Sequence, residues 1–182
     1  MEILKSSIPE VIVLAPPVFT DSRGYFLETY QQKKYAELGI PKPFVQDNQS
    51  YSTKNVLRGL HFQLRYPQGK LVRVTQGTVF DVAIDIRKNS PTFGKWHGEI
   101  LSAENHKQMY IPENFAHGFC VLSDSAEFLY KCTDFYVPGD EGGLIWNDPQ
   151  LGIKWPIDLP ILSDKDAALP QIADILELLP SD

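Results

Sequence analysis

The stretch TVFDVAIDI, residues Thr78–Ile86, decides the fold class of this chain. Its even-numbered positions from Phe80 to Ile86 are all apolar, while its odd-numbered positions include the carboxylates Asp81 and Asp85. A period of two residues is typical of a β-strand, whose successive side chains point to opposite faces of a sheet. We therefore predict that this stretch forms a strand.

Similar β-rich runs lie on both sides of this stretch, each bounded by Gly, Pro, Asn or Asp. Helical periodicity is found only in Gln31–Leu38, which Gly39 and Pro41 end, and in a stripe of apolar residues beginning near Pro170. Short strands with so little helix between them predict an antiparallel barrel or sandwich rather than a parallel α/β sheet. The other predicted strands are Asn55–Gln63, Lys70–Thr75, His97–Leu101, Gln108–Ile111, His117–Leu122, Glu127–Phe135 and Gly143–Trp146.

The composition fits one folded domain over residues 1–182. The 12 Gly and 14 Pro are spread along the chain without a repeat or a linker, and the apolar fraction of 43% is ordinary for a soluble globular protein. A net charge of -6 argues against bulk nucleic acid as the main partner, because phosphate neutralisation needs an excess of cations. A small anion remains possible, since a few converging cations can hold it.

The chain shows no signal-peptide pattern and no apolar run long enough to span a bilayer. These features predict a cytoplasmic protein with no membrane partner. Its two cysteines, Cys120 and Cys132, lie in apolar β-like runs, so we expect small buried thiols rather than a disulfide.

The segment Val56–Gln63 contains the first candidate for chemistry, His61. On a regular strand His61 shares a face with Gln63, and Arg58 lies on the other face or at the start of the strand. His61 could be a base, a metal ligand or a core residue. Barrels that bind a metal often use a His-X-His pair, but here the position two residues after His61 holds Gln63, and no other histidine is paired in this way. The pattern predicts a site without metal.

Other polar residues have two interpretations each. His117, among aromatic residues after a turn, either caps a strand or contacts a ligand. Tyr130 alternates with apolar residues, so its hydroxyl needs a partner, and it is either structural or an acid facing a base across the barrel. Asp164 is expected to begin a helix, while Asp166 could reach back to orient a histidine.

Four cations, Arg23, Arg58, Lys70 and Arg73, lie near turns beside predicted strands. Each could be a solvated surface charge, or together they could clamp a diphosphate, for which the forked guanidinium is well suited. No glycine-rich phosphate loop is present, so we do not expect a Rossmann-type nicotinamide site.

Taken together, these segments resemble the dTDP-4-dehydrorhamnose 3,5-epimerases of bacterial L-rhamnose synthesis. The resemblance implies a cupin-type antiparallel β-barrel, or jelly roll, with short peripheral helices and a C-terminal helix. It also implies a homodimer that exchanges an N-terminal strand, and a role in lipopolysaccharide or O-antigen synthesis. Eight motifs in the family's order carry it: Asp21–Glu28, Gln46–Ser50, Leu57–Gln63, Gln68–Val74, Ala116–Phe119, Phe128–Lys131, Trp146–Pro149 and Leu162–Asp166.

The resemblance implies a reaction without cofactor, in which C3 and C5 of dTDP-4-dehydro-6-deoxy-D-glucose are inverted to give dTDP-4-dehydro-L-rhamnose. His61 is then the base with Asp166 as its partner, Tyr130 is the acid, and Lys70 stabilises the enolate. Tyr136 is expected to stack on thymine. The remaining substrate contacts implied are Arg23, Phe26, Glu28, Gln46, Asp47, Asn48, Arg58, Gln63, His117, Glu141 and Lys165.

Three rival functions stay open at this point. A mono-epimerase or a 3,4-ketoisomerase could keep the same base and acid and differ only in their reach. A sugar-nucleotide binding module would use the same cavity without chemistry. A metal-dependent cupin oxygenase would require a metal that the histidine pattern does not favour.

Overall fold

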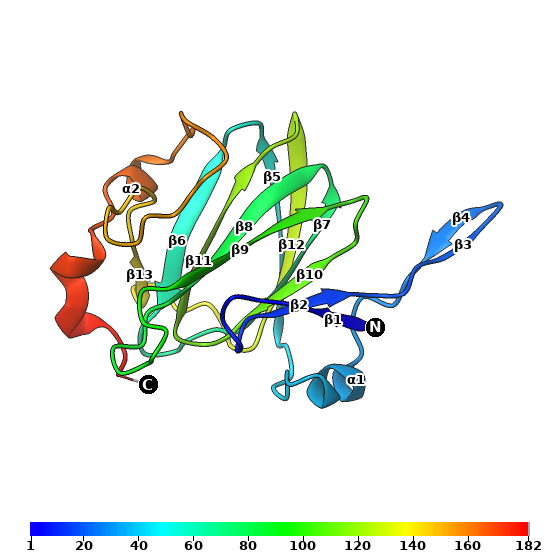
Figure 1. Cartoon of the computed structure of the whole chain (residues 1–182), viewed down its shortest axis with the longest axis horizontal. Helices are drawn as coiled ribbons and strands as arrows, with labels where there is room; N and C mark the ends of the chain where they lie inside the picture. The colour runs from blue at the N-terminus through cyan, green and yellow to red at the C-terminus, as the bar shows by residue number, and fades with distance from the viewer. Residues whose placement is uncertain (182) are drawn as a thin grey trace.

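The computed structural model describes residues 1–181; Asp182, the last residue of the predicted domain, lies outside the described residues. Two antiparallel sheets face each other, and a small hairpin extends from one side of the body (Figure 1). The order of strands is β1-β2-β10-β7-β12-β5 in the six-stranded sheet and β13-β6-β11-β8-β9 in the five-stranded sheet. This arrangement confirms the predicted all-β, cupin-like class.

The bounds of the elements are as follows. The six-stranded sheet contains β1 (Glu2–Leu4), β2 (Ile12–Ala15), β5 (Gln46–Thr53), β7 (Lys70–Gln76), β10 (Gln108–Ile111) and β12 (Ser125–Cys132). The five-stranded sheet contains β6 (Leu57–Gln63), β8 (Thr78–Asp85), β9 (Trp96–Ser102), β11 (Phe115–Val121) and β13 (Glu141–Gly143). The hairpin is β3 (Phe19–Asp21) and β4 (Gly24–Phe26), and the helices are α1 (Gln32–Glu37), α2 (Asp164–Ala167) and a 3₁₀-helix over Ile172–Leu178.

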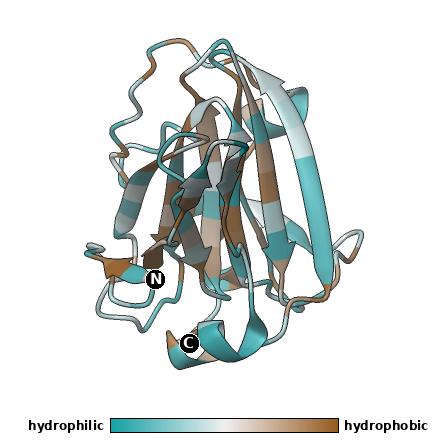
Figure 2. Cartoon of the chain, turned by 90° about the vertical axis from the view of Figure 1, so that its right-hand side faces the viewer, coloured by the Kyte–Doolittle hydropathy of each residue, from teal (hydrophilic) through white to brown (hydrophobic). Residues whose placement is uncertain are grey.

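Strand β8 is buried on both faces, which places the site. Its even-numbered residues Phe80, Val82 and Ile84 pack under the C-terminal segment, together with Leu144 and Ile172. Its odd-numbered face, which carries Asp81, is turned toward the six-stranded sheet, since Val79 and Ala83 belong to the core between the sheets. The apolar stripes of the central strands are visible in Figure 2. The polar face of the deciding stretch is therefore the inner one.

Seven of the eight predicted strands are present, with shifted ends; the run Glu127–Phe135, for example, stops at Cys132. The eighth, Gly143–Trp146, was misplaced, because β13 covers Glu141–Gly143 and Trp146 lies in a turn. Sequence patterning missed β1 to β5. Helix α1 confirms the prediction at Gln31–Leu38, with Gln31 as its N-cap. Within residues 1–181, no helix combines the length and apolar character needed to cross a bilayer.

The predicted C-terminal α-helix is instead a 3₁₀-helix over Ile172–Leu178. A 3₁₀-helix has three residues per turn, so residues three apart share a face. Ile172 and Ile175 accordingly share a face that packs against the five-stranded sheet. Leu179, just after the helix, packs there as well, while Leu176 is 36% exposed. Most of the predicted apolar stripe is therefore buried, and only the type of helix was wrong.

Candidate active site

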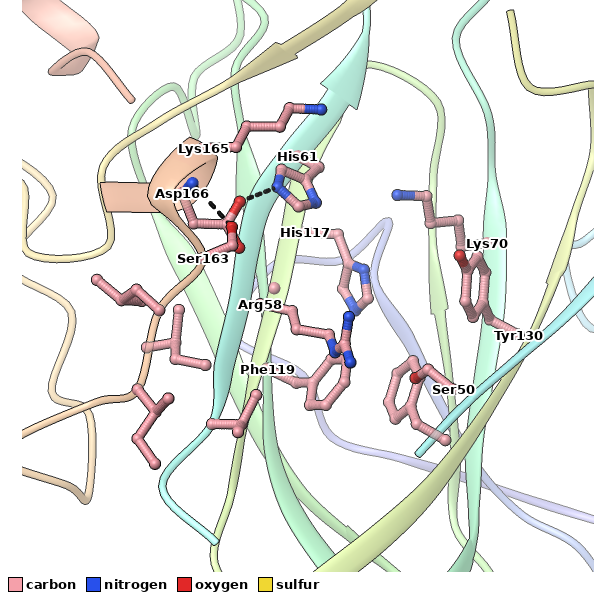
Figure 3. Close-up of a pocket in the computed structure, with 16 residues that line it drawn as sticks. Ser50, Arg58, His61, Lys70, His117, Phe119, Tyr130, Ser163, Lys165 and Asp166 are labelled. Atoms are coloured by element: carbon pink, nitrogen blue, oxygen red, sulfur yellow. Dashed lines mark hydrogen bonds and ion pairs between the residues drawn. The ribbon is translucent and has the colours of Figure 1, made fainter. Parts of the chain in front are cut away.

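The two sheets enclose a cavity of about 450 Å³, lined by strands of both sheets and by the segment around α2 (Figure 3). A smaller cavity of about 250 Å³ adjoins it and contains Gln46, Asn48, Gln63, Tyr136 and Glu141. His61, Lys70 and Tyr130 line both cavities, so they stand at the junction between the two.

His61 is held by a buried carboxylate. Its Nε2 lies 2.6 Å from Asp166 Oδ1, although the two residues are 105 positions apart in the chain. Asp166 is only 4% exposed and sits in the first turn of α2, where Ser163 Oγ accepts a hydrogen bond from its backbone N–H. The cap of α2 therefore fixes the carboxylate, and the carboxylate fixes the ring, leaving Nδ1 directed away from Asp166 (Figure 3).

The surroundings of His61 favour its neutral form. Burial lowers the pKa of His61 below its ordinary value of 6.5, the hydrogen bond and charge of Asp166 offset part of this effect, and the charges of Lys70 and Lys165 lower the pKa further. A neutral ring that donates Nε2–H to Asp166 presents a free lone pair on Nδ1. At neutral pH this atom can accept a proton.

Lys70 and Tyr130 lie on neighbouring strands of the opposite sheet. Burial lowers the pKa of Lys70, while the negative groups Asp81 and Glu141 favour its charged form. Lys70 forms no ion pair with any other residue in 1–181, so its ammonium can serve an anion in the cavity. Burial raises the pKa of Tyr130, which keeps its phenol protonated and able to donate a proton.

A second histidine and carboxylate pair lies directly beside the first. His117 on β11 is the register partner of His61 on β6, and its Nε2 lies 3.0 Å from both oxygens of Asp81. Asp81 is fully buried on β8. His117 therefore lines the cavity rather than capping a strand. The sequence signal for this role of Asp81 was a carboxylate within the apolar strand Thr78–Ile86.

Arg58 lies at the start of β6, as one of its two predicted alternatives had it, but it lines the same cavity as His61 rather than facing the other side of the sheet. Between Arg58 and His61 strand β6 advances three residues while β11 advances two, from Phe119 to His117. This β-bulge shifts the alternation by one residue. Gly59 permits it with φ +106, and a Cβ there would lie 2.6 Å from the His117 carbonyl oxygen.

Several other predicted residues surround the smaller cavity. Gln63 is used by the protein itself: its amide donates to the carbonyl oxygens of Tyr66 and Phe135 and accepts from the N–H of Val137. Gln46 accepts from the N–H of Tyr136. These two amides thus hold the loop that carries Tyr136. Glu141 and Lys165 form an ion pair of 2.6 Å at the same cavity.

Four predicted substrate contacts lie elsewhere in the chain. Arg23 and Phe26 are on the protruding hairpin, where the Arg23 side chain is 88% exposed and Phe26 is 68% exposed (Figure 1). Glu28 pairs with Lys34. Asp47 points to the outer face of β5, where it pairs with Lys131. None of these four side chains lines either cavity.

Among residues 1–181, no three His, Cys, Asp or Glu side chains are grouped so that they could hold a metal ion. Cys120 and Cys132 are both free and buried, as expected. A site without metal stays a prediction, which activity in the presence of a chelator would test.

A cupin-like β-barrel with an imidazole, an ammonium and a phenol around one cavity is the arrangement of a proton-transfer enzyme. The family model described as dTDP-4-dehydrorhamnose 3,5-epimerase matches residues 5–174. This chain belongs to the dTDP-4-dehydrorhamnose 3,5-epimerase family, and it is an enzyme of the isomerase class.

Relatives of this chain include 3,5-epimerases and a monoepimerase. The dTDP-4-dehydrorhamnose 3,5-epimerase of Shigella flexneri is 58% identical over 168 residues, which cover 91% of this chain and 93% of the relative. The crystal structure of the Legionella pneumophila enzyme in complex with dTDP-4-keto-L-rhamnose has a TM-score of 0.96 and 53% identity, covering 100% of this chain and 98% of that one. A 3'-monoepimerase from Streptomyces bikiniensis in complex with dTDP-quinovose is 33% identical, with a TM-score of 0.89 and coverage of 96% and 91%.

Proposed function

We propose that this enzyme inverts C3 and C5 of dTDP-4-dehydro-6-deoxy-D-glucose and gives dTDP-4-dehydro-L-rhamnose, with His61 as base and Tyr130 as acid. The observation that carries the proposal is the junction of the two cavities. A base favoured in its neutral form, a protonated phenol and a half-buried ammonium meet there, and they come from two facing sheets.

The proposed chemistry is the same at both carbons. His61 Nδ1 takes the proton from the carbon beside the C4 ketone, and the C–H electron pair forms a carbon–carbon double bond as the ketone becomes an enolate. The Lys70 ammonium stabilises the enolate oxygen. Tyr130 then donates its proton to the opposite face of the carbon, the ketone re-forms, and solvent restores both side chains.

The two cavities suggest how the substrate lies. The smaller one offers the Tyr136 ring and the amides of Gln46 and Asn48, which suit a thymine base, while the larger one accommodates the sugar. The bound dTDP-4-keto-L-rhamnose of the Legionella relative supports a ligand of this kind. Arg58 and Lys165 supply positive charge for the diphosphate.

The experiment that tests the function is incubation of the purified enzyme with the 4-keto sugar nucleotide, with and without chelator, followed by NMR of the sugar ring. We expect dTDP-4-dehydro-L-rhamnose at the same rate in both samples. A product inverted at one carbon alone would make the enzyme a mono-epimerase, and loss of activity with chelator would contradict a site without metal.

The pH dependence of kcat/KM should show the opposite effects of Asp166 and Lys70 on the pKa of His61. Activity falls at acid pH as His61 becomes protonated, and burial places this limb below pH 6.5. Asp166→Asn removes a group that raises the pKa of His61, so the limb should move to lower pH. Lys70→Met removes a group that lowers it, so the limb should move to higher pH.

Both variants should also be slower than wild type, so the test uses only the direction in which the acid limb of each pH profile shifts. Complete pH–rate profiles of the three proteins give the measurement. A shift of both variants in the same direction would contradict the assignment of this limb to His61.

We further propose a homodimer in which the β3–β4 hairpin of one subunit reaches the cavity of the other. The exposed Arg23 and Phe26 support this, because within one chain they contact neither cavity. We also propose a cytoplasmic location, in keeping with the free thiols of Cys120 and Cys132.

A complementation experiment tests the shared site. His61→Asn inactivates a cavity, whereas the double variant Arg23→Ala/Phe26→Ala inactivates a hairpin, and each protein alone should be nearly inactive. If the two are unfolded and refolded together in equal amounts, half of the dimers are mixed and contain one intact site, so ~25% of wild-type activity should return. Mixtures that stay inactive would show that each site is built from a single chain.

A further inference from the structure

Ser50 lies on the inner face of β5 and has an unsatisfied hydroxyl. Its Oγ is buried, yet it has no hydrogen-bond partner among residues 1–181. The neighbouring inward residues are both satisfied: Ser52 Oγ accepts from Arg58 Nε at 2.9 Å, and the Asn48 side chain bonds to Gln46 and Cys132. A buried hydroxyl without a partner is unfavourable, which points to a ligand group at this position.

Ser50 belongs to the larger cavity, at a distance from the Asp166 end. It is the register partner of Phe128 on β12, so Tyr130 is two residues further along the neighbouring strand. Arg58 is anchored on Ser52, the next inward residue of β5. Figure 3 shows Ser50, Arg58 and Tyr130 around the same part of the cavity, across from Asp166.

The part of the larger cavity around Ser50 suits a neutral hydroxyl of a ligand. A serine hydroxyl can donate one hydrogen bond and accept others, and the adjoining surface is aromatic, because the rings of Phe119 and Phe128 stack with centroids 4.1 Å apart. The sugar of the proposed substrate carries two hydroxyls, at C2 and C3. Inversion at C3 moves the C3 hydroxyl to the other face of the ring, whereas the C2 hydroxyl keeps its configuration throughout.

We propose that Ser50 binds the C2 hydroxyl of the sugar and thereby determines specificity for substrates that carry it. The inference rests on the proposed function, because it takes the 4-keto sugar as ligand. A hydroxyl on a central part of a strand has a fixed position, and it can hold a group that stays in place while the ring is inverted at two other carbons. Ser50 positions the ring and takes no part in proton transfer.

The test compares wild type and Ser50→Ala on three compounds: the 4-keto sugar nucleotide, its 2-deoxy analogue and its 3-deoxy analogue. Deuterium uptake at C5 is a readout common to all three. We expect Ser50→Ala to lower kcat/KM about tenfold on the full substrate, mainly through KM, with dTDP affinity unchanged. On the 2-deoxy analogue, wild type and variant should be equal, since the bond is already missing.

Two further variants keep the test decisive. Thr53→Ala, on the exposed face of the same strand, should behave as wild type. If Ser50→Ala does not fold, Ser50→Cys keeps a similar volume with a much weaker donor and should show the same pattern.

An unchanged kcat/KM on the full substrate, or a tenfold loss that persists on the 2-deoxy analogue, would overturn the proposal. A loss that vanishes only on the 3-deoxy analogue would move the contact to C3 and overturn it as well. Wild type inactive on the full substrate would refute the proposed function instead.

Discussion

Replacing His61 by asparagine is expected to lower kcat by about 10³-fold or more, because the variant lacks the group proposed to accept the proton. Asparagine can still donate a hydrogen bond toward Asp166, so the buried carboxylate keeps a partner. The expected result is loss of both inversion and exchange of substrate hydrogens with solvent. Steady-state kinetics and NMR in deuterated water measure the two effects separately.

The same variant should still fold and bind the nucleotide. The His61 side chain is 34% exposed, so its replacement leaves no large internal cavity. An unchanged thermal unfolding temperature and an unchanged affinity for dTDP are the controls. Substantial deuterium exchange by His61→Asn would show that another base, such as His117, removes the proton.

Replacing Tyr130 by phenylalanine is expected to separate proton removal from inversion. The base remains, so the carbon–hydrogen bond is still broken and the enolate still forms. Without the phenol the opposite face is no longer protonated, so product formation should fall by about 10²–10³-fold. Solvent deuterium should nevertheless enter the unreacted substrate, because His61 can return a proton to the original face.

Tyr51→Phe is the matched control for this experiment. Tyr51 lies on the outer face of β5 and is 57% exposed, so the same loss of a hydroxyl there should leave the rate unchanged. If Tyr130→Phe forms product at the wild-type rate, a different group is the acid.

The barrel and the deciding strand could be predicted because burial leaves a regular pattern in the sequence. Strand β8 alternates between two buried faces, and its inner face carries Asp81, whose carboxylate bonds to His117. The same alternation predicted that Tyr130 would share an apolar face, and it packs against the core between the sheets.

Strand β5 could not be found in this way. Its inward residues, such as Asn48 and Ser50, line the cavities and are polar, while its outward residues, such as Asp47, are exposed. Neither face is apolar, so the strand has no hydrophobic period. The polar inward residues that let β5 line the site also remove the apolar pattern by which a strand is predicted.

Contacts between residues far apart in the chain also could not be predicted from local sequence patterns. The bond between His61 and Asp166 joins residues 105 positions apart. The residues alone suggested that Asp166 could orient a histidine, and only the family resemblance named His61. The bulge at Gly59 turns Arg58 into the cavity, although simple alternation predicts the opposite. Register shifts of this kind depend on the partner strand, which the local sequence does not describe.

The central claim is that this enzyme removes and replaces a proton at two carbons beside one ketone. Complete conversion of dTDP-4-dehydro-6-deoxy-D-glucose in deuterated water, followed by measurement of deuterium at each ring carbon of the product, tests it most directly. The account predicts one deuterium at C3 and one at C5, and none at C2. A product that carries protium at C3 or C5 would contradict it.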